Sequence, residues 1–367
     1  MTQIYDIFAV APPGLEHFLL QEVRENGFKS VTASPGGISF KGSWPEVWRA
    51  NLELRGASRV LVRIGHFMAF HLAQLDKRAT KFPWSDTLPS GCALKVEVTS
   101  QKSKIYHAGA ARERIETALT ANGYRISADA LVSIKARIDD NKVTLSLDSS
   151  GEGLHKRGHK QAIGKAPMRE TLAALFLRQA GYSGAEPVLD PMCGSGTFPI
   201  EAAEIALGAQ PGRARDFAFQ HFVGFDTDAF AALRRPLKEA KSAFAFHGSD
   251  RDAGVISQAQ ANAARASVAP ICSFAAKPVL DLTGPEGPPG LVMVNPPYGT
   301  RIGNKKLLYA LHNTLGQVLQ DRFKGWRVAI VTSETALAKA SGLPFKKPSS
   351  PVPHGGLKVR LFQTDPL

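Results

Sequence analysis

The feature that most constrains the fold is an alternation of short apolar runs and amphipathic helical patterns from residue 186 to residue 363. Runs such as LVMV at 291–294 and VAIV at 328–331 contain no polar residue. Strands of this kind are buried on both faces, which is typical of parallel sheets that helices cover on two sides. This part of the chain therefore predicts a mostly parallel α/β sheet.

The first 155 residues have a different pattern. Strands that alternate apolar and polar residues are mixed there with amphipathic helices, which indicates small α+β units. A chain of 367 residues is also longer than one compact core usually serves. We therefore expect three domains, at 1–66, 67–155 and 156–367.

A glycine loop follows the first apolar run of the third domain, in VLDPMCGSGTFPIEAA at 188–203. Asp190 ends the predicted strand, and Gly194 and Gly196 permit the bend and the close approach that a bound ligand needs. Only Gly-x-Gly is present, and an acid precedes it. This favours S-adenosylmethionine, which carries an ammonium and a sulfonium group, over a dinucleotide with its pyrophosphate. A plain tight turn is the alternative.

A second acid is expected after the next strand, where it would bind ribose hydroxyls. Two places compete, Asp226 in FVGFDTD and Asp250 in FAFHGSD. An amphipathic helix follows Asp250, so we select it. We expect Asp226 to be an exposed acid in an insertion at about 211–243.

The run LVMV ends in NPPY at 295–298. An amide oxygen of Asn295 and the backbone carbonyl of Pro296 can each accept one N–H of an exocyclic base amine, which points its lone pair at a methyl donor. Pro297 stiffens the turn, and the ring of Tyr298 offers a stacking face to a base taken out of its helix. If it stood alone, the motif would be interpreted as a stiff Pro-Pro turn with an amide cap.

The formal net charge of +13 and the pI near 9.7 indicate a polyanionic partner, with nucleic acid ahead of a membrane surface. Two basic segments could contact RNA phosphates. A helix entry at 100–114 and a connector at 153–161 contribute the predicted RNA-binding residues Lys102, Lys104, Tyr106, His107, Arg112, Lys156, Arg157 and Lys160. An ordinary solvated helix entry is the alternative for residues 100–114.

The three cysteines, Cys92, Cys193 and Cys272, are far apart and form no CxxC pair, so we expect neither a disulfide framework nor a metal site. We find no signal peptide and no apolar run of membrane-spanning length. A cytoplasmic protein is the expectation.

LDPMCGSGTFPIEAAEIA, GSDRDAGVISQAQANAARA and VNPPYGTRIG together resemble the class I, S-adenosylmethionine-dependent RNA guanine-N2 methyltransferases that carry a THUMP domain. The likeness is to the large-subunit ribosomal RNA methyltransferase L family, whose members are often labelled N6-adenine-specific DNA methylases. It implies a Rossmann-like class I methyltransferase domain behind a ferredoxin-like domain (1–66) and a THUMP RNA-binding domain (67–155).

The resemblance also implies residue roles. Asn295, Pro296, Pro297 and Tyr298 would be the catalytic amine clamp. The donor would be bound by Asp190, Pro191, Cys193, Gly194, Ser195, Gly196, Thr197, Asp250 and Asn295. One departure stands out, because Pro278 occupies the place of an acid that contacts the donor's adenine. Either Asp281, three positions later, or the backbone would then make that contact.

The implied activity is methylation of guanine N2 in RNA, with 23S ribosomal RNA first. Three alternatives stay open: tRNA as the substrate, adenine N6 as the target, since NPPY alone does not distinguish the two amines, and a non-catalytic RNA-binding assembly factor.

Overall fold

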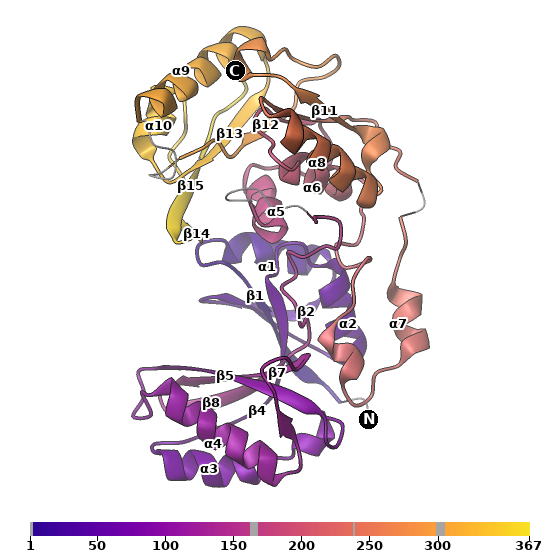
Figure 1. The fold of residues 1–367 in the computed structure, drawn as a ribbon, viewed down its shortest axis with the longest axis vertical. Helices are drawn as coiled ribbons and strands as arrows, with labels where there is room; N and C mark the ends of the chain where they lie inside the picture. The colour runs from indigo at the N-terminus through magenta and orange to yellow at the C-terminus, as the bar shows by residue number, and fades with distance from the viewer. Residues whose placement is uncertain (1–2, 162–167, 238, 299–304) are drawn as a thin grey trace. The chain divides into compact units, whose positions relative to one another are not determined.

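A computed structural model describes residues 3–161, 168–237, 239–298 and 305–367 (Figure 1). It divides into two compact units. The first unit contains residues up to Ala11, Leu20–Leu154 and Arg215–Arg234, and the second contains Pro12–Leu19, His155–Ala214 and Arg235–Leu367. Each unit is built on its own sheet.

Within the described part of the first unit, eight strands form one sheet in the order β2-β3-β1-β4-β8-β7-β5-β6. Their bounds are β1 (Tyr5–Val10), β2 (Lys29–Ser34), β3 (Gly37–Gly42), β4 (Arg59–Met68), β5 (Ala93–Gln101), β6 (Arg125–Ile126), β7 (Val132–Asp139) and β8 (Lys142–Asp148). β4 pairs with both β1 and β8, so the sheet is continuous through the predicted boundary at residue 66.

The helices of this unit begin with the signals that the sequence provides. Ser43 and Glu46 form a capping box at the start of α2, and His107 accepts a hydrogen bond from the Ala110 amide at the start of α4. The helical bounds are α1 (Glu16–Glu25, which spans the division at residue 19), α2 (Trp44–Glu53), α3 (Leu72–Thr80), η1 (Trp84–Asp86), α4 (Ala108–Ala121), η2 (Ala218–His221) and α7 (Thr227–Leu233).

Residues 215–234 belong to the first unit, although they lie between two elements of the second unit in sequence. Trp48 on α2 packs against Phe219, Phe225 and Phe230, with ring centroids 5.6 to 6.3 Å apart. Arg215 donates hydrogen bonds to three backbone carbonyls at 150–153. The predicted insertion is thus an aromatic segment packed into the first unit.

The second unit contains seven strands among its described residues, in the order β11-β10-β9-β12-β13-β15-β14. Their bounds are β9 (Val188–Asp190), β10 (Phe246–Asp250), β11 (Cys272–Ala276), β12 (Leu291–Val294), β13 (Arg327–Thr332), β14 (Val352–His354) and β15 (Leu357–Gln363). The pairs from β11 to β13 are parallel, while β15 is antiparallel to both β13 and β14. This arrangement confirms the Rossmann-like α/β prediction.

Helices of the second unit cover its sheet (Figure 1). Their bounds are α5 (Glu170–Gln179), α6 (Thr197–Ala206), α8 (Ala253–Arg265), η3 (Ala269–Ile271), η4 (Val279–Asp281), α9 (Lys305–Arg322) and α10 (Thr335–Ala340). Val292 and Val294 of β12 are buried in one cluster with Leu315 and Leu319 of α9. At Gly316 a Cβ would lie 1.6 Å from the Ser341 carbonyl oxygen, so α9 requires glycine at this close contact. The end of β12 therefore rests on a tightly packed core.

The strands β2, β6 and β7 are absent from the sequence-based prediction. β2 reads KSVTAS and carries no buried residue, so its apolar signal is weak. The predicted start of the helix now seen as α5, at Pro167, lies outside the described residues.

Candidate active site

The ends of β9 and β12 lie side by side. β9 pairs in parallel with β12 through Val188–Leu291 and Leu189–Val292, and with β10 on its other side. The chain order reverses at this point, since β10 and β11 lie on one side of β9 and β12 and β13 on the other. Ligands bind at the carboxyl ends of strands at such switch points. Asp190 is the last residue of β9, and Asn295 directly follows β12.

The glycine loop after β9 bends sharply into α6. Gly194 and Gly196 have φ values of 51° and 85°, in the left-handed region that favours glycine. A Cβ at Gly194 would meet no atom within 4 Å, so the loop faces open space there. The Cys193 amide donates to the Ser249 carbonyl at 2.9 Å, which ties the loop to β10.

Two carboxyl groups lie beside this loop. Asp250 Oδ2 accepts a hydrogen bond from the Gly194 amide at 3.2 Å. Asp190 is 3% exposed, and its Oδ1 accepts from the Met192 amide at 3.0 Å. Burial raises the pKa of Asp190 to about 8, and the charge of Asp250 adds to the rise. A cation bound between these groups would favour the ionised form of Asp190.

The NPPY turn presents an acceptor that has no partner. Asn295 Oδ1 is buried and makes no hydrogen bond within the described residues. An unsatisfied buried acceptor costs about 1–3 kcal/mol, which a donor on a bound ligand would offset. His312 of α9 is fully buried against the Pro297 backbone, and this burial lowers its pKa. A neutral imidazole therefore lies behind the turn.

The structure brings Asp250, and not Asp226, next to the glycine loop. Asp226 is exposed in the first unit, where its side chain caps α7 by accepting from the Ala229 amide at 3.0 Å. Asp250 is the last residue of β10, which pairs with β9. Its ribose contact stays a prediction.

The segment after β11 runs next to Asp250, because the Lys277 amide donates to the Asp250 carbonyl at 2.9 Å. Pro278 precedes the short helix η4, and Asp281 is the exposed last residue of that helix. The adenine contact by Asp281 or by backbone stays a prediction.

Two of the three connector cations do not face solvent. Arg157 pairs with Glu201 at 3.2 Å, and both side chains are almost fully buried. Lys160 Nζ lies 3.2 Å from a Glu170 carboxylate oxygen and also contacts Thr197. Charges paired with carboxylates inside the unit are less available to phosphates, and the RNA-binding role of Arg157 and Lys160 stays a prediction. Lys156 is exposed, and its role stays a prediction.

The predicted RNA platform in the first unit is exposed. Tyr106 is 84% exposed, and Lys102, Lys104, His107 and Arg112 are exposed around it. The Lys104 amide donates to Asn141 Oδ1 at 2.8 Å, and Lys104 Nζ lies 5.6 Å from the centre of the exposed Phe70 ring. The β7–β8 turn thus shapes a basic and aromatic surface.

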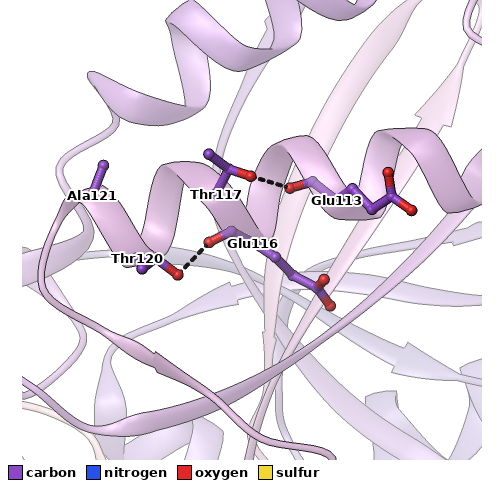
Figure 2. A pocket seen from close by; sticks show the side chains of 5 residues that line it. All are labelled: Glu113, Glu116, Thr117, Thr120 and Ala121. Carbon is purple, nitrogen blue, oxygen red and sulfur yellow. Dashed lines mark hydrogen bonds between the residues drawn. The ribbon is translucent and has the colours of Figure 1, made fainter.

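A hollow on α4 is a weaker candidate (Figure 2). It is lined by Glu113, Glu116, Thr117, Thr120 and Ala121. Both hydroxyls donate to backbone carbonyls one helical turn earlier, at 2.8 and 2.9 Å. Two carboxylates would repel phosphate, so this hollow does not suit RNA.

Sequence reasoning missed Asn262 and Arg265 on α8. Asn262 is 1% exposed, and its Nδ2 donates to the Ser195 carbonyl at 3.0 Å. Arg265 donates to Asn262 Oδ1 and to the His159 carbonyl. The available signal was an asparagine on the apolar face of an amphipathic helix.

Two family models match the chain. One describes an RMKL-like methyltransferase domain and matches residues 157–354, and the other describes the RlmL ferredoxin-like domain and matches residues 6–61. The first match covers more than half of the 367 residues. The chain belongs to the RMKL-like methyltransferase family. The predicted family and the ferredoxin-like start are thereby confirmed.

Two curated relatives support this membership. A candidate RNA methyltransferase of Synechocystis is 32% identical over 97% of this chain and 95% of its own length. The ribosomal RNA large subunit methyltransferase K/L of Marinobacter nauticus is 32% identical over 92% of this chain. This chain spans 49% of the Marinobacter protein's length.

Solved structures extend the family likeness to the whole chain. One is a predicted N6-adenine-specific DNA methylase from Listeria monocytogenes. It is 30% identical, with a TM-score of 0.87 over 100% of this chain and 97% of its own. SMU.472, a candidate methyltransferase solved with S-adenosylhomocysteine, is 27% identical with a TM-score of 0.87 over 100% of this chain and 99% of its own. Among the residues described here, no helix is long and apolar enough to cross a membrane.

We predict that Asp190 makes the stability of the ligand-free protein depend on pH. Its folded pKa, about 8, lies above the ordinary value of 3.8, so between these values the folded state holds a proton that the unfolded state has lost. Relative to Asp190→Asn, the wild-type free energy of unfolding should therefore fall as pH rises from 5 to 8, by at most about 1.4 kcal/mol per pH unit.

Thermal or urea unfolding of both proteins at several pH values measures this difference. A constant difference between pH 5 and pH 8 would contradict the raised pKa.

Proposed function

We propose that this family member transfers a methyl group from S-adenosylmethionine to the exocyclic N2 amine of guanine in RNA, with large-subunit ribosomal RNA as its substrate. The observation that carries this proposal is the buried Asn295 Oδ1, which has no partner within the described residues and follows a strand paired with β9. The named activity of the Marinobacter relative supports the choice of RNA. A cytoplasmic location fits such a substrate.

The residues of the glycine loop suit the donor. When bound, S-adenosylmethionine supplies an electrophilic methyl group on a sulfonium. Asp190, whose burial disfavours its ionised form, gains a cationic partner in the donor's ammonium. Gly194 opens onto free space and lets the backbone approach, and Asp250 offers a carboxylate to the ribose hydroxyls. The S-adenosylhomocysteine bound to SMU.472, which is the donor without its methyl group, supports this choice of cofactor.

The NPPY turn positions the acceptor amine. Asn295 Oδ1 and the Pro296 carbonyl each accept one N–H of the amine, which withdraws the nitrogen lone pair from the ring and directs it at the methyl group. Tyr298 stacks on the base, and Pro297 limits movement of the turn. Orientation of this kind supplies much of the rate acceleration in such a transfer. The base must first leave its stack to reach the turn.

A second candidate is methylation of adenine N6. An Asn-Pro-Pro-Tyr clamp fits either amine, and the description of the Listeria structure favours adenine. The basic and aromatic surface around Tyr106 favours a flexible single-stranded or folded RNA, whose bases can stack on exposed rings.

The direct test is methyl transfer from labelled donor to ribosomal RNA, tRNA and DNA, followed by digestion and identification of the nucleoside. We expect N2-methylguanosine from ribosomal RNA. Label only in adenine, or only in DNA, would contradict the proposal.

Asp250→Asn should raise the KM for the donor, whereas Asp226→Asn should not, because Asp226 caps a helix in the first unit.

We also predict that Lys104→Glu combined with Arg112→Glu weakens RNA binding by about tenfold or more in 0.1 M salt, because two phosphate contacts are replaced by repulsive charges. Turnover of a saturating minimal substrate should stay at the wild-type level. Filter binding over a range of salt concentrations gives the affinities.

Lys29→Glu combined with Lys41→Glu is the matched control, since both lysines are exposed on paired strands of the same sheet and the charge change is equal. Equal losses of affinity in the two double variants would contradict a localised RNA surface.

A further inference from the structure

Side chains from outside the donor loop (residues 190–197) form hydrogen bonds with it on both sides of Gly196. On one side, Asn262 Nδ2 donates to the Ser195 carbonyl at 3.0 Å. Asn262 Oδ1 in turn accepts from Arg265, whose Nε donates to the His159 carbonyl at 2.6 Å. A chain of hydrogen bonds thus joins the connector to the loop through α8.

On the other side, the connector reaches the loop directly. Lys160 Nζ donates to Thr197 Oγ1 at 2.9 Å and to the Met168 carbonyl at 3.1 Å. Its charge is balanced by Glu170 at 3.2 Å, and both side chains are largely buried. Charge-assisted hydrogen bonds in such surroundings are stronger than neutral ones on a surface.

These bonds act where the backbone conformation is least common. Gly196 has a φ of 85° and begins α6, with Ser195 before it and Thr197 after it. Securing the Ser195 carbonyl fixes the plane of the peptide that leads into Gly196, and securing the Thr197 hydroxyl fixes the first residue of the helix. A loop without ladder bonds keeps one conformation only when neighbouring groups determine it.

We propose that Lys160, Asn262 and Arg265 are positioning residues that hold the donor loop in its binding conformation, which makes connector residues 157–160 part of the cofactor site. This inference rests on the proposed function in one respect, namely that the loop binds S-adenosylmethionine. It gives Lys160 a role in donor affinity, which is separate from the RNA-binding role predicted from the sequence.

The test uses two substitutions that remove one contact each. Lys160→Met keeps the length of the side chain and removes the bond to Thr197. Asn262→Asp keeps the acceptor for Arg265 and removes the donor to Ser195. Each variant should raise the Kd for S-adenosylmethionine in calorimetry, and its KM in turnover, by about tenfold or more. The kcat at saturating donor should stay within about twofold, because the NPPY turn is unchanged.

Arg213→Met is the matched control. Arg213 forms an equally buried ion pair with Glu204, at the far end of α6 from the loop. Breaking this pair should lower the melting temperature and leave the Kd for the donor unchanged. Lys160→Arg should recover part of the lost affinity, since it restores a cation beside Glu170 and Thr197.

Wild-type Kd values in Lys160→Met and Asn262→Asp would overturn the proposal. A Kd that rises equally in Arg213→Met would also overturn it, because the effect would then reflect general destabilisation. If the wild-type protein binds the donor but methylates no RNA, the proposed function fails while this inference is still decided by the Kd values.

Discussion

The direct pairing of β9 with β12 is the constraint on which the rest of the site depends. It places Asp190 and Asn295, 105 residues apart in sequence, at neighbouring strand ends. If another strand lay between β9 and β12, the glycine loop and the NPPY turn would be too far apart to bind one donor and one acceptor amine side by side. The strand order therefore turns two separate motifs into one site, with acidic side chains that can bind a cation at one end and acceptors for an amine at the other.

The same edge of the sheet keeps polar groups in unfavourable states. Asp190 is buried with a pKa raised to about 8, and Asn295 Oδ1 has no partner within the described residues. Such groups destabilise a folded protein, so they persist only where the surrounding structure is well packed. Here β12 and α9 supply that packing, through Val292, Val294 and the helix contact at Gly316. A bound cation and a bound amine would relieve both costs.

The sequence predicted the second sheet, the glycine loop and a position near that loop for Asp250 and not Asp226, because those features depend on local patterns of apolar residues and glycine. It did not predict the ion pairs of the connector, where Arg157 and Lys160 resemble solvated charges until their partners are known. The partners were visible as glutamates in apolar helices, namely Glu201 in TFPIEAAEIALG and Glu170 in ETLAALFLRQ. A buried ion pair requires knowledge of which helix covers which loop, and that information is tertiary. The packing of residues 215–234 onto Trp48 was hidden for the same reason.

The most direct test of the account separates donor binding from methyl transfer in Asn295→Ala. Calorimetry with S-adenosylmethionine and single-turnover methylation of RNA would be measured on the same preparation, beside the wild-type protein. The account predicts a donor Kd close to the wild-type value and a methylation rate at least about a hundredfold lower, because the donor loop is intact while the amine loses its oriented acceptor. Two results would contradict the assignment of the NPPY turn as the amine clamp. One is a donor Kd that rises by as large a factor as the methylation rate falls, and the other is methylation at the wild-type rate.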